Sequence, residues 1–141
     1  AGTDHYLFNH ENGFDDGSTV PASAISSHIE SSQIDIGDGD KFLFVSKVIP
    51  DITFRNSPDS TPTATFTLKT RNFPGGSYLQ TSDSSVARTA QETSTVVEQF
   101  TNQANIRLRG RSFALRVAST DTEIGWRLGS PRIEVRPDGR R

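Results

Sequence analysis

The chain has 141 residues, a net charge of −2, and neither cysteine nor methionine. A chain of this length suits one domain with a sizeable core. Its lack of cysteine excludes a disulfide framework, a thiolate nucleophile and zinc held by cysteine. The missing methionine fits either removal of the initiator or a piece of a longer chain.

Membrane insertion is not expected from this composition. Hydrophobic residues make up 32% of the chain, and no apolar run approaches the roughly 20 residues that cross a bilayer. The opening AGTDHYLFNHENG lacks the basic start and apolar middle of a signal peptide. We therefore expect a soluble protein that assembles in a reducing cytoplasm.

Residues 1–32 have a loop-like composition, which predicts an N-terminal arm or the end of a preceding element. Residues 33–141 are then one all-β domain. The histidines, His5, His10 and His28, all lie in the first segment. They do not have H-E-x-x-H spacing, and no G-x-S-x-G elbow supplies a nucleophilic serine. We expect no catalytic residues, and hence not an enzyme.

Carboxylates cluster with glycine in D-I-G-D-G-D, which contains Asp35, Asp38 and Asp40. Oxygen ligands spaced in this way can wrap Ca²⁺, but the twelve-residue EF-hand pattern is absent. Aspartate and glycine are also the ordinary residues of tight turns. Arginines of an adjacent subunit are a third set of partners for these acids. The sequence therefore predicts no cofactor and gives these three residues only as weak calcium candidates.

Alternation with period two predicts strands in several segments. Lys41–Phe54 begins with the apolar run FLFV, and its Pro50 indicates a bulge or an edge position. Thr63–Arg71 places Ala64, Phe66 and Leu68 on one face. Ser84–Gln103, the best helix candidate, lacks an apolar stripe at helical spacing.

Two later strands change phase near a glycine. In Ile106–Val117 the apolar positions shift by one residue around Gly110, which predicts a β-bulge or a tight turn. In Gly125–Pro137 the segment 129–131 absorbs a similar slip. Trp126 alternates with Leu128 and is expected in the core. Its expected packing partners are Phe42, Phe44, Phe54, Phe66, Phe113 and Leu115.

Short strands separated by turn-rich loops predict an antiparallel β-sandwich, jelly-roll-like, with β-propeller blades as the alternative. The charge is divided unevenly over the sequence. Residues 1–100 carry 6 Lys/Arg against 13 Asp/Glu, a charge of −7, whereas residues 101–141 carry 9 Arg against 4 acids, a charge of +5. Such asymmetry suggests either a polyanion or an acidic partner surface, or the pairing of the two halves with each other.

Arginines in the last third of the chain are the candidates for a surface that faces a partner or DNA. They are Arg107, Arg109, Arg111, Arg116, Arg127, Arg132 and Arg136. The use of arginine without lysine favours planar, bidentate contacts over diffuse attraction to a polyanion. We therefore rank internal or intersubunit pairing above DNA contact, which stays the second reading.

Several ordered motifs resemble one family. They are IESSQIDIGDGDKFLF, VIPDITF, TFTLKTRNFPGG, FTNQANIRLRGRSFALRV and GWRLGSPRIEVRPDGRR. The combination is similar to the C-terminal region of the tail nozzle, tail tubular or packaged-DNA stabilisation proteins of short-tailed bacteriophages. The resemblance covers the chain from about Tyr6 onward. Members of this family are usually much longer than this chain.

This resemblance implies a virion structural protein of the phage tail, assembled in the host cytoplasm. It would form a homo-oligomeric ring, contact other tail or portal-adaptor proteins, extend the DNA channel and help retain packaged DNA until ejection. Non-specific contact with phage DNA follows from the same reading. The alternative is a carbohydrate-binding β-sandwich module of a phage fibre or a secreted enzyme, for which one Trp and two Tyr are few exposed-aromatic candidates.

Overall fold

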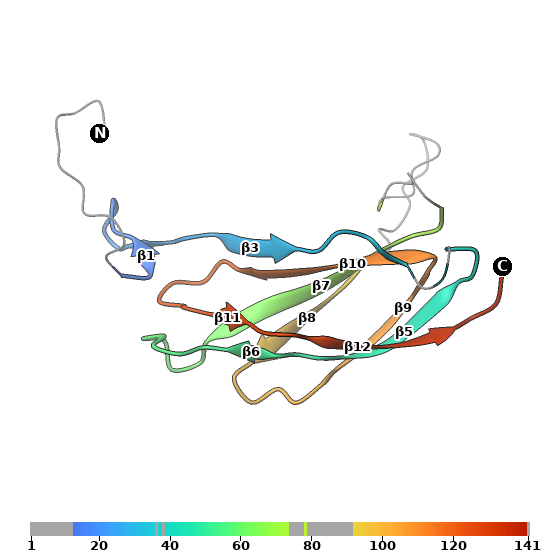
Figure 1. Ribbon diagram of the computed structural model, residues 1–141. Coiled ribbons are helices and arrows are strands. Elements are labelled where there is room, and N and C mark those ends of the chain that lie inside the picture. Colours follow the sequence, from blue (N-terminus) through green and yellow to red (C-terminus); the bar gives the residue numbers. More distant parts are fainter. Residues whose placement is uncertain (1–12, 36, 38, 74–77, 79–91, 141) are drawn as a thin grey trace, which may run out of the picture.

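The computed structural model describes residues 13–35, 37, 39–73, 78 and 92–140. In these residues all strand pairing is antiparallel, and strands and turns occur without any helix. Two sheets face each other across one hydrophobic core, so the predicted antiparallel β-sandwich is confirmed (Figure 1). The described strands form neither a closed barrel nor a propeller.

The first sheet has the order β3-β10-β7-β8, and β4 also pairs with β10. Its strands are β3 (Ser27–Glu30), β4 (Ile34–Asp35), β7 (Thr63–Arg71), β8 (Glu92–Glu98) and β10 (Ser112–Ser119). β8 lies inside the segment that was the best helix candidate, and residues 84–91 of that segment lie outside the described residues. β3 belongs to the segment assigned to the arm, yet it pairs with β10 along its whole length.

The second sheet has the order β12-β5-β9, formed by β5 (Leu43–Ile49), β9 (Ala104–Gly110) and β12 (Arg132–Pro137). Two short ladders complete the structure. β6 (Ile52–Thr53) pairs with β11 (Arg127–Leu128), and β1 (Asp15–Asp16) pairs with β2 (Ser23–Ala24). Figure 1 shows these short ladders near the end of the sandwich opposite the C-terminus.

The predicted alternation of Thr63–Arg71 is present in β7. Ala64, Phe66, Leu68 and Thr70 are buried, and the residues between them are half-buried on the outer face. A strand in the middle of a sheet buries one face against the opposite sheet, so period two follows directly from its position. Phe66 is fully enclosed and is the largest such side chain.

Gly110 lies where the chain passes from one sheet to the other. The predicted bulge or tight turn within one sheet is therefore not what the structure has there. β9 belongs to the second sheet and β10 to the first, and these two strands do not pair with each other. The chain crosses between sheets at Gly110 and Arg111, so the inward parity must change there. Ile106 and Leu108 enter the core from one side, whereas Phe113 enters it from the other.

The two remaining breaks also mark places where the chain leaves a sheet. Pro50 separates β5 from β6, and residues 129–131 separate β11 from β12. Asp51 joins these breaks, because its backbone oxygen accepts from Gly129 N at 2.7 Å and its carboxylate accepts from Ser130 N at 2.7 Å. The predicted slip at 129–131 is therefore a real interruption between two ladders.

The aromatic packing differs in part from the expectation. Phe54, Phe66, Phe113 and Leu115 are buried in the core, and Trp126 packs against it while partly exposed. Phe42 and Phe44 are only half-buried and are not core residues. Phe44 belongs to β5 between the buried Leu43 and Val45, so alternation turns it outward.

Candidate binding surfaces

The outer face of the second sheet is basic. Arg107 and Arg109 alternate with buried residues of β9 and are exposed, as their spacing predicted. Arg132 and Arg136 occupy outward positions of β12, because Ile133 and Val135 between them pack against the core. Lys47 of β5 lies opposite Glu134 and is the fifth cation of this face. We call these five residues the basic face. Lys47 was not among the sequence candidates, which were confined to arginines.

Glu134 is the acid in the middle of the basic face. Its carboxylate accepts a hydrogen bond from Ser46 Oγ at 2.7 Å, and its oxygens lie 3.0 Å from Lys47 Nζ and 3.3 Å from an Arg136 nitrogen. The hydrogen bonds from Ser46 and Lys47, with a smaller contribution from Arg136, lower the pKa of Glu134 to about 2. Glu134 therefore stays ionised and forms ion pairs with two neighbouring cations.

A β-bulge in β5 allows both Ser46 and Lys47 to contact Glu134. The register of β5 shifts between Val45 and Lys47 in both of its ladders. In a regular strand Ser46 and Lys47 would point to opposite faces, whereas a bulge lets consecutive side chains reach the same side. Both therefore contact Glu134. The sequence carries no glycine or proline at this position that would have indicated the bulge.

Arg109 and Arg111 hold the end of the sandwich near the C-terminus. The Arg109 Nε donates to the Asp138 carboxylate, and an Arg109 NH₂ group donates to the Asp138 backbone oxygen at 3.1 Å. The guanidinium carbon of Arg109 lies 4.1 Å from the centroid of the Phe42 ring, and that of Arg111 lies 4.6 Å from it. Phe42 is thus a cation–π partner of both arginines.

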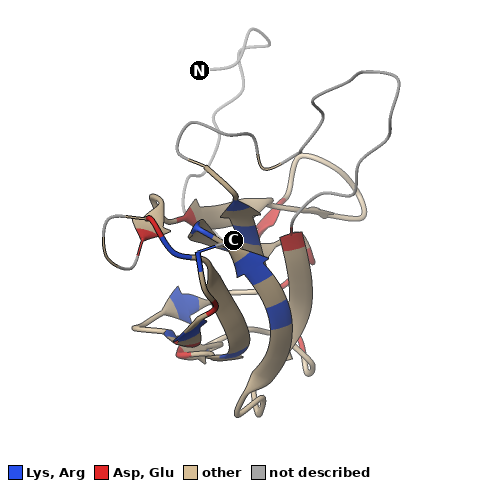
Figure 2. Cartoon of the chain, turned by 90° about the vertical axis from the view of Figure 1, so that its right-hand side faces the viewer, with Lys and Arg blue, Asp and Glu red and all other residues tan. Residues whose placement is uncertain are grey.

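Arg111 is largely engaged by the chain itself. Its guanidinium donates to the backbone oxygens of Gly39, Asp40 and Arg140. These contacts join the loop before β5 to the C-terminal segment. Figure 2 looks at this end and shows Lys and Arg positions close together on neighbouring strands around the C-terminus.

Arg116 and Arg127 do not extend the basic face. Because the chain changes sheet at Gly110, Arg116 lies on the outer face of the first sheet, where it pairs in register with Glu30 and Thr67. There the hydrogen bond from Lys69 lowers the pKa of Glu30, and the Arg116 charge adds to it. Arg127 lies in the separate β6–β11 ladder. The seven candidate arginines are therefore divided among different faces of the sandwich.

The acidic and histidine candidates are not brought together as a site. Asp35 and Asp40 are exposed, and Asp38 lies outside the described residues. Within the described ranges, no three His, Cys, Asp or Glu side chains are grouped so that they could hold a metal ion. His28 is exposed, whereas His5 and His10 belong to residues 1–12, which the structure does not describe.

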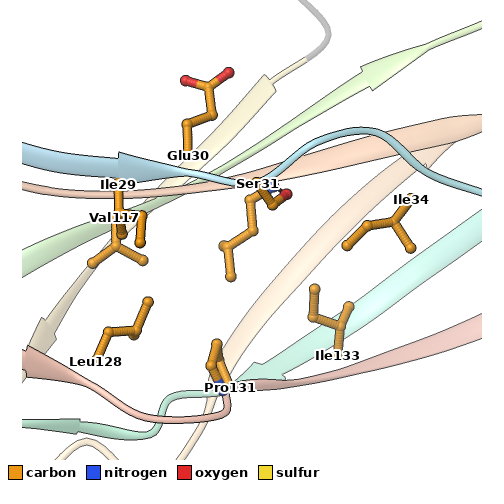
Figure 3. A pocket seen from close by; sticks show the side chains of 9 residues that line it. Ile29, Glu30, Ser31, Ile34, Val117, Leu128, Pro131 and Ile133 are labelled. Carbon is orange, nitrogen blue, oxygen red and sulfur yellow. Dashed lines mark hydrogen bonds between the residues drawn. The ribbon is translucent and has the colours of Figure 1, made fainter.

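An apolar groove of about 290 Å³ opens between the two sheets along β3 and β12. Figure 3 shows its lining, which is aliphatic apart from Glu30 and Ser31. Ile29, Leu128 and Ile133 point into the groove, whereas Glu30 points away from it and pairs with Lys69. The groove therefore offers apolar contact and no set of converging polar groups.

The fold and the basic face together define a β-sandwich with one strongly cationic side. No protein-family model and no curated protein matches this chain. None of the described residues belongs to a helix with the length and apolarity needed to span a bilayer.

Proposed function

We propose that this chain is a structural subunit of the tail of a short-tailed bacteriophage, a nozzle or tail-tube component that works by binding rather than by catalysis. It would assemble with copies of itself and with neighbouring tail or portal-adaptor proteins in the host cytoplasm, extend the DNA channel and help retain packaged DNA. The motif resemblance supports the phage assignment, and the basic face supports the mode of binding.

Two cations of the basic face carry the proposal. Arg107 and Arg132 are exposed and have no ion-pair partner among the described residues, whereas Lys47, Arg109 and Arg136 are paired with acids of this chain. Unpaired arginines at the two edges of a sheet face are available to a carboxylate-bearing partner. An arginine fork matches a carboxylate with two parallel hydrogen bonds.

Acidic groups suited to this face lie at the end of the sandwich opposite the C-terminus, near the short ladders (Figure 1). Loops there are joined by Thr63 Oγ1 to Asp121 at 2.9 Å and by Glu123 N to Asp15 at 2.6 Å. In the same loops Asp16 is exposed and Asp59 is half-buried. When one end of a molecule complements a different surface of its neighbour, the contact is heterologous and builds rings when the rotation closes. A second copy is therefore the partner that the proposal names first.

DNA is the competing partner for the basic face. Phosphates would engage all five cations and would make binding fall steeply with salt. The proposal favours protein because Glu134 occupies the centre of the face and neutralises part of it. A surface built to follow a phosphate backbone gains nothing from a fixed carboxylate there.

Sedimentation velocity over a range of protein concentrations tests the assembly. The proposal predicts a discrete oligomer whose fraction rises with concentration and falls with salt. Fluorescence anisotropy with a duplex of mixed sequence is run on the same samples. A chain that stays monomeric at every concentration and binds the duplex tightly would overturn the proposal in favour of DNA contact.

A further inference from the structure

A second hollow lies on another side of the molecule, at the β6–β11 ladder. Its volume is about 350 Å³, and it is lined by Phe14, Thr53, Arg55, Asn56, Gly125, Trp126 and Arg127. This volume is at the lower end of the range for ligand pockets, which suits a ligand of one ring. We call it the β11 pocket.

The polar lining of the β11 pocket favours an anion. Thr53 and Arg127 are direct partners in the β6–β11 ladder, so their side chains share a face. Arg55 follows Thr53 by two residues. Neither arginine has an ion-pair partner among the described residues, and no carboxylate lines the pocket. Two arginines that line one pocket can provide bidentate sites for a carboxylate or a phosphate.

The aromatic lining favours a ligand with an apolar ring face. The indole N–H of Trp126 already donates to Ser27 Oγ at 3.0 Å. Its side chain can therefore offer a ligand only the carbon surface of the ring. The Phe14 ring lies directly against Gly125, since a Cβ on this glycine would be 2.4 Å from a ring carbon. Phe14 and Trp126 thus both line the pocket next to Gly125.

The walls of the pocket are held in place by the fold. Ser57 Oγ donates to Gly125 O at 2.8 Å and accepts from Gly125 N at 2.9 Å, which fixes the loop after β6 to the segment before β11. In the described part of the chain, the non-glycine residues with positive φ are Asn56, at 61°, and Glu123, at 60°. They lie in the two loops beside the pocket, and such conformations gather at ligand sites.

We infer that the β11 pocket binds an acidic monosaccharide unit, a pyranose ring that carries a carboxylate. The carboxylate contacts Arg55 and Arg127, the C–H face of the ring packs on the aromatic side chains, and Asn56 and Thr53 serve the hydroxyl groups. A nucleotide also combines an anion with a ring, so adenosine monophosphate is the competing ligand in the test. This inference does not depend on assembly of the chain.

Trp126 is the single tryptophan, so its indole N–H gives one isolated NMR signal that reports on the pocket. The chain is titrated with sodium galacturonate, with galactose, which has the same ring without the carboxylate, and with adenosine monophosphate. We expect a saturable shift of the indole signal with galacturonate and binding at least about ten-fold weaker with galactose, the usual loss for a missing charged hydrogen bond. Equal binding of galactose, tighter binding of the nucleotide, or no saturable shift with galacturonate would overturn the inference.

Substitutions of the pocket arginines test whether galacturonate binds in the β11 pocket. Because Arg55 and Arg127 are exposed, the double variant R55Q/R127Q keeps the fold, which its melting temperature checks. It should lose at least about ten-fold in galacturonate affinity. The variant R107Q/R132Q removes the same two charges from the basic face and should bind normally. If a folded R55Q/R127Q variant binds as well as the parent chain, the inference fails.

Discussion

Gly110 lies so close to Thr70 that a Cβ atom on the glycine would be 2.5 Å from the Thr70 Cβ. Thr70 is buried in β7 of the first sheet, and Gly110 ends β9 of the second. The two sheets therefore approach closely at the corner where the chain passes from one to the other. Glycine is required there by space, since its backbone conformation is one that other residues adopt.

Substitution of Gly110 by alanine should destabilise the fold. The added methyl group must displace the Thr70 backbone or side chain, and overpacking of this kind costs about 1–3 kcal/mol. The free energy of unfolding in urea measures this cost. Gly17→Ala is the matched control, because nothing lies within 4 Å of its Cβ position. Equal stability of the two variants would show that the corner is wider than described.

Substitutions of Arg109 and of Arg107 should change the free energy of unfolding by different amounts, although the two residues lie two positions apart on one face. Arg109 contacts Asp138 and the Phe42 ring, whereas Arg107 has no ion pair with a described residue. Arg109→Gln should lower the free energy of unfolding by roughly 1 kcal/mol, the usual value of an exposed ion pair with a cation–π contact. Arg107→Gln should change it by less than about 0.5 kcal/mol. Urea unfolding of both variants checks this, and a larger loss for Arg107→Gln would contradict the assigned contacts.

Glu134 should make stability depend on acid pH. Its pKa is lowered from an ordinary value of 4.5 to about 2. A lowered pKa in the folded state stabilises the fold at pH values above 4.5, and this contribution is lost as the pH falls towards 2. In Glu134→Gln this part of the dependence is absent. Urea unfolding at several pH values between 6 and 2 should show that the two chains differ most at pH 6 and converge at low pH. A constant difference over this range would mean that Glu134 is not held ionised by its neighbours.

Period two was enough to predict the fold class. The alternation in Thr63–Arg71 and Ile106–Leu108 depends on local chain geometry, so each strand shows it without knowledge of its neighbours. The break at Gly110 was also visible. The structural cause of the break could not be predicted, because a bulge within a ladder and a crossing to another sheet produce the same phase change in the sequence.

The basic face could be predicted only in part for the same reason. Arg107, Arg109, Arg132 and Arg136 were found by alternation within single strands. Arg116 was wrongly added, since its face depends on which sheet the chain enters after the corner. Lys47 and the central position of Glu134 were not predicted, because both depend on a bulge at Ser46 and on the pairing of β5 with β12.

The β11 pocket was beyond the reach of local patterns. It combines Phe14, the turn after β6 and the segment before β11, three regions far apart in sequence. Trp126 was expected in the core, and the proximity of Arg55 and Asn56 to it follows from tertiary pairing alone.

Native mass spectrometry of the parent chain and of the R107Q/R132Q variant tests the central proposal most directly. We expect a discrete oligomer for the parent chain and a shift towards monomer for the variant, with the melting temperature of the monomer unchanged. The R55Q/R127Q variant carries the same loss of charge elsewhere and should assemble like the parent. A parent chain that is monomeric throughout, or an R107Q/R132Q variant that forms the same oligomer as the parent, would contradict assembly through the basic face.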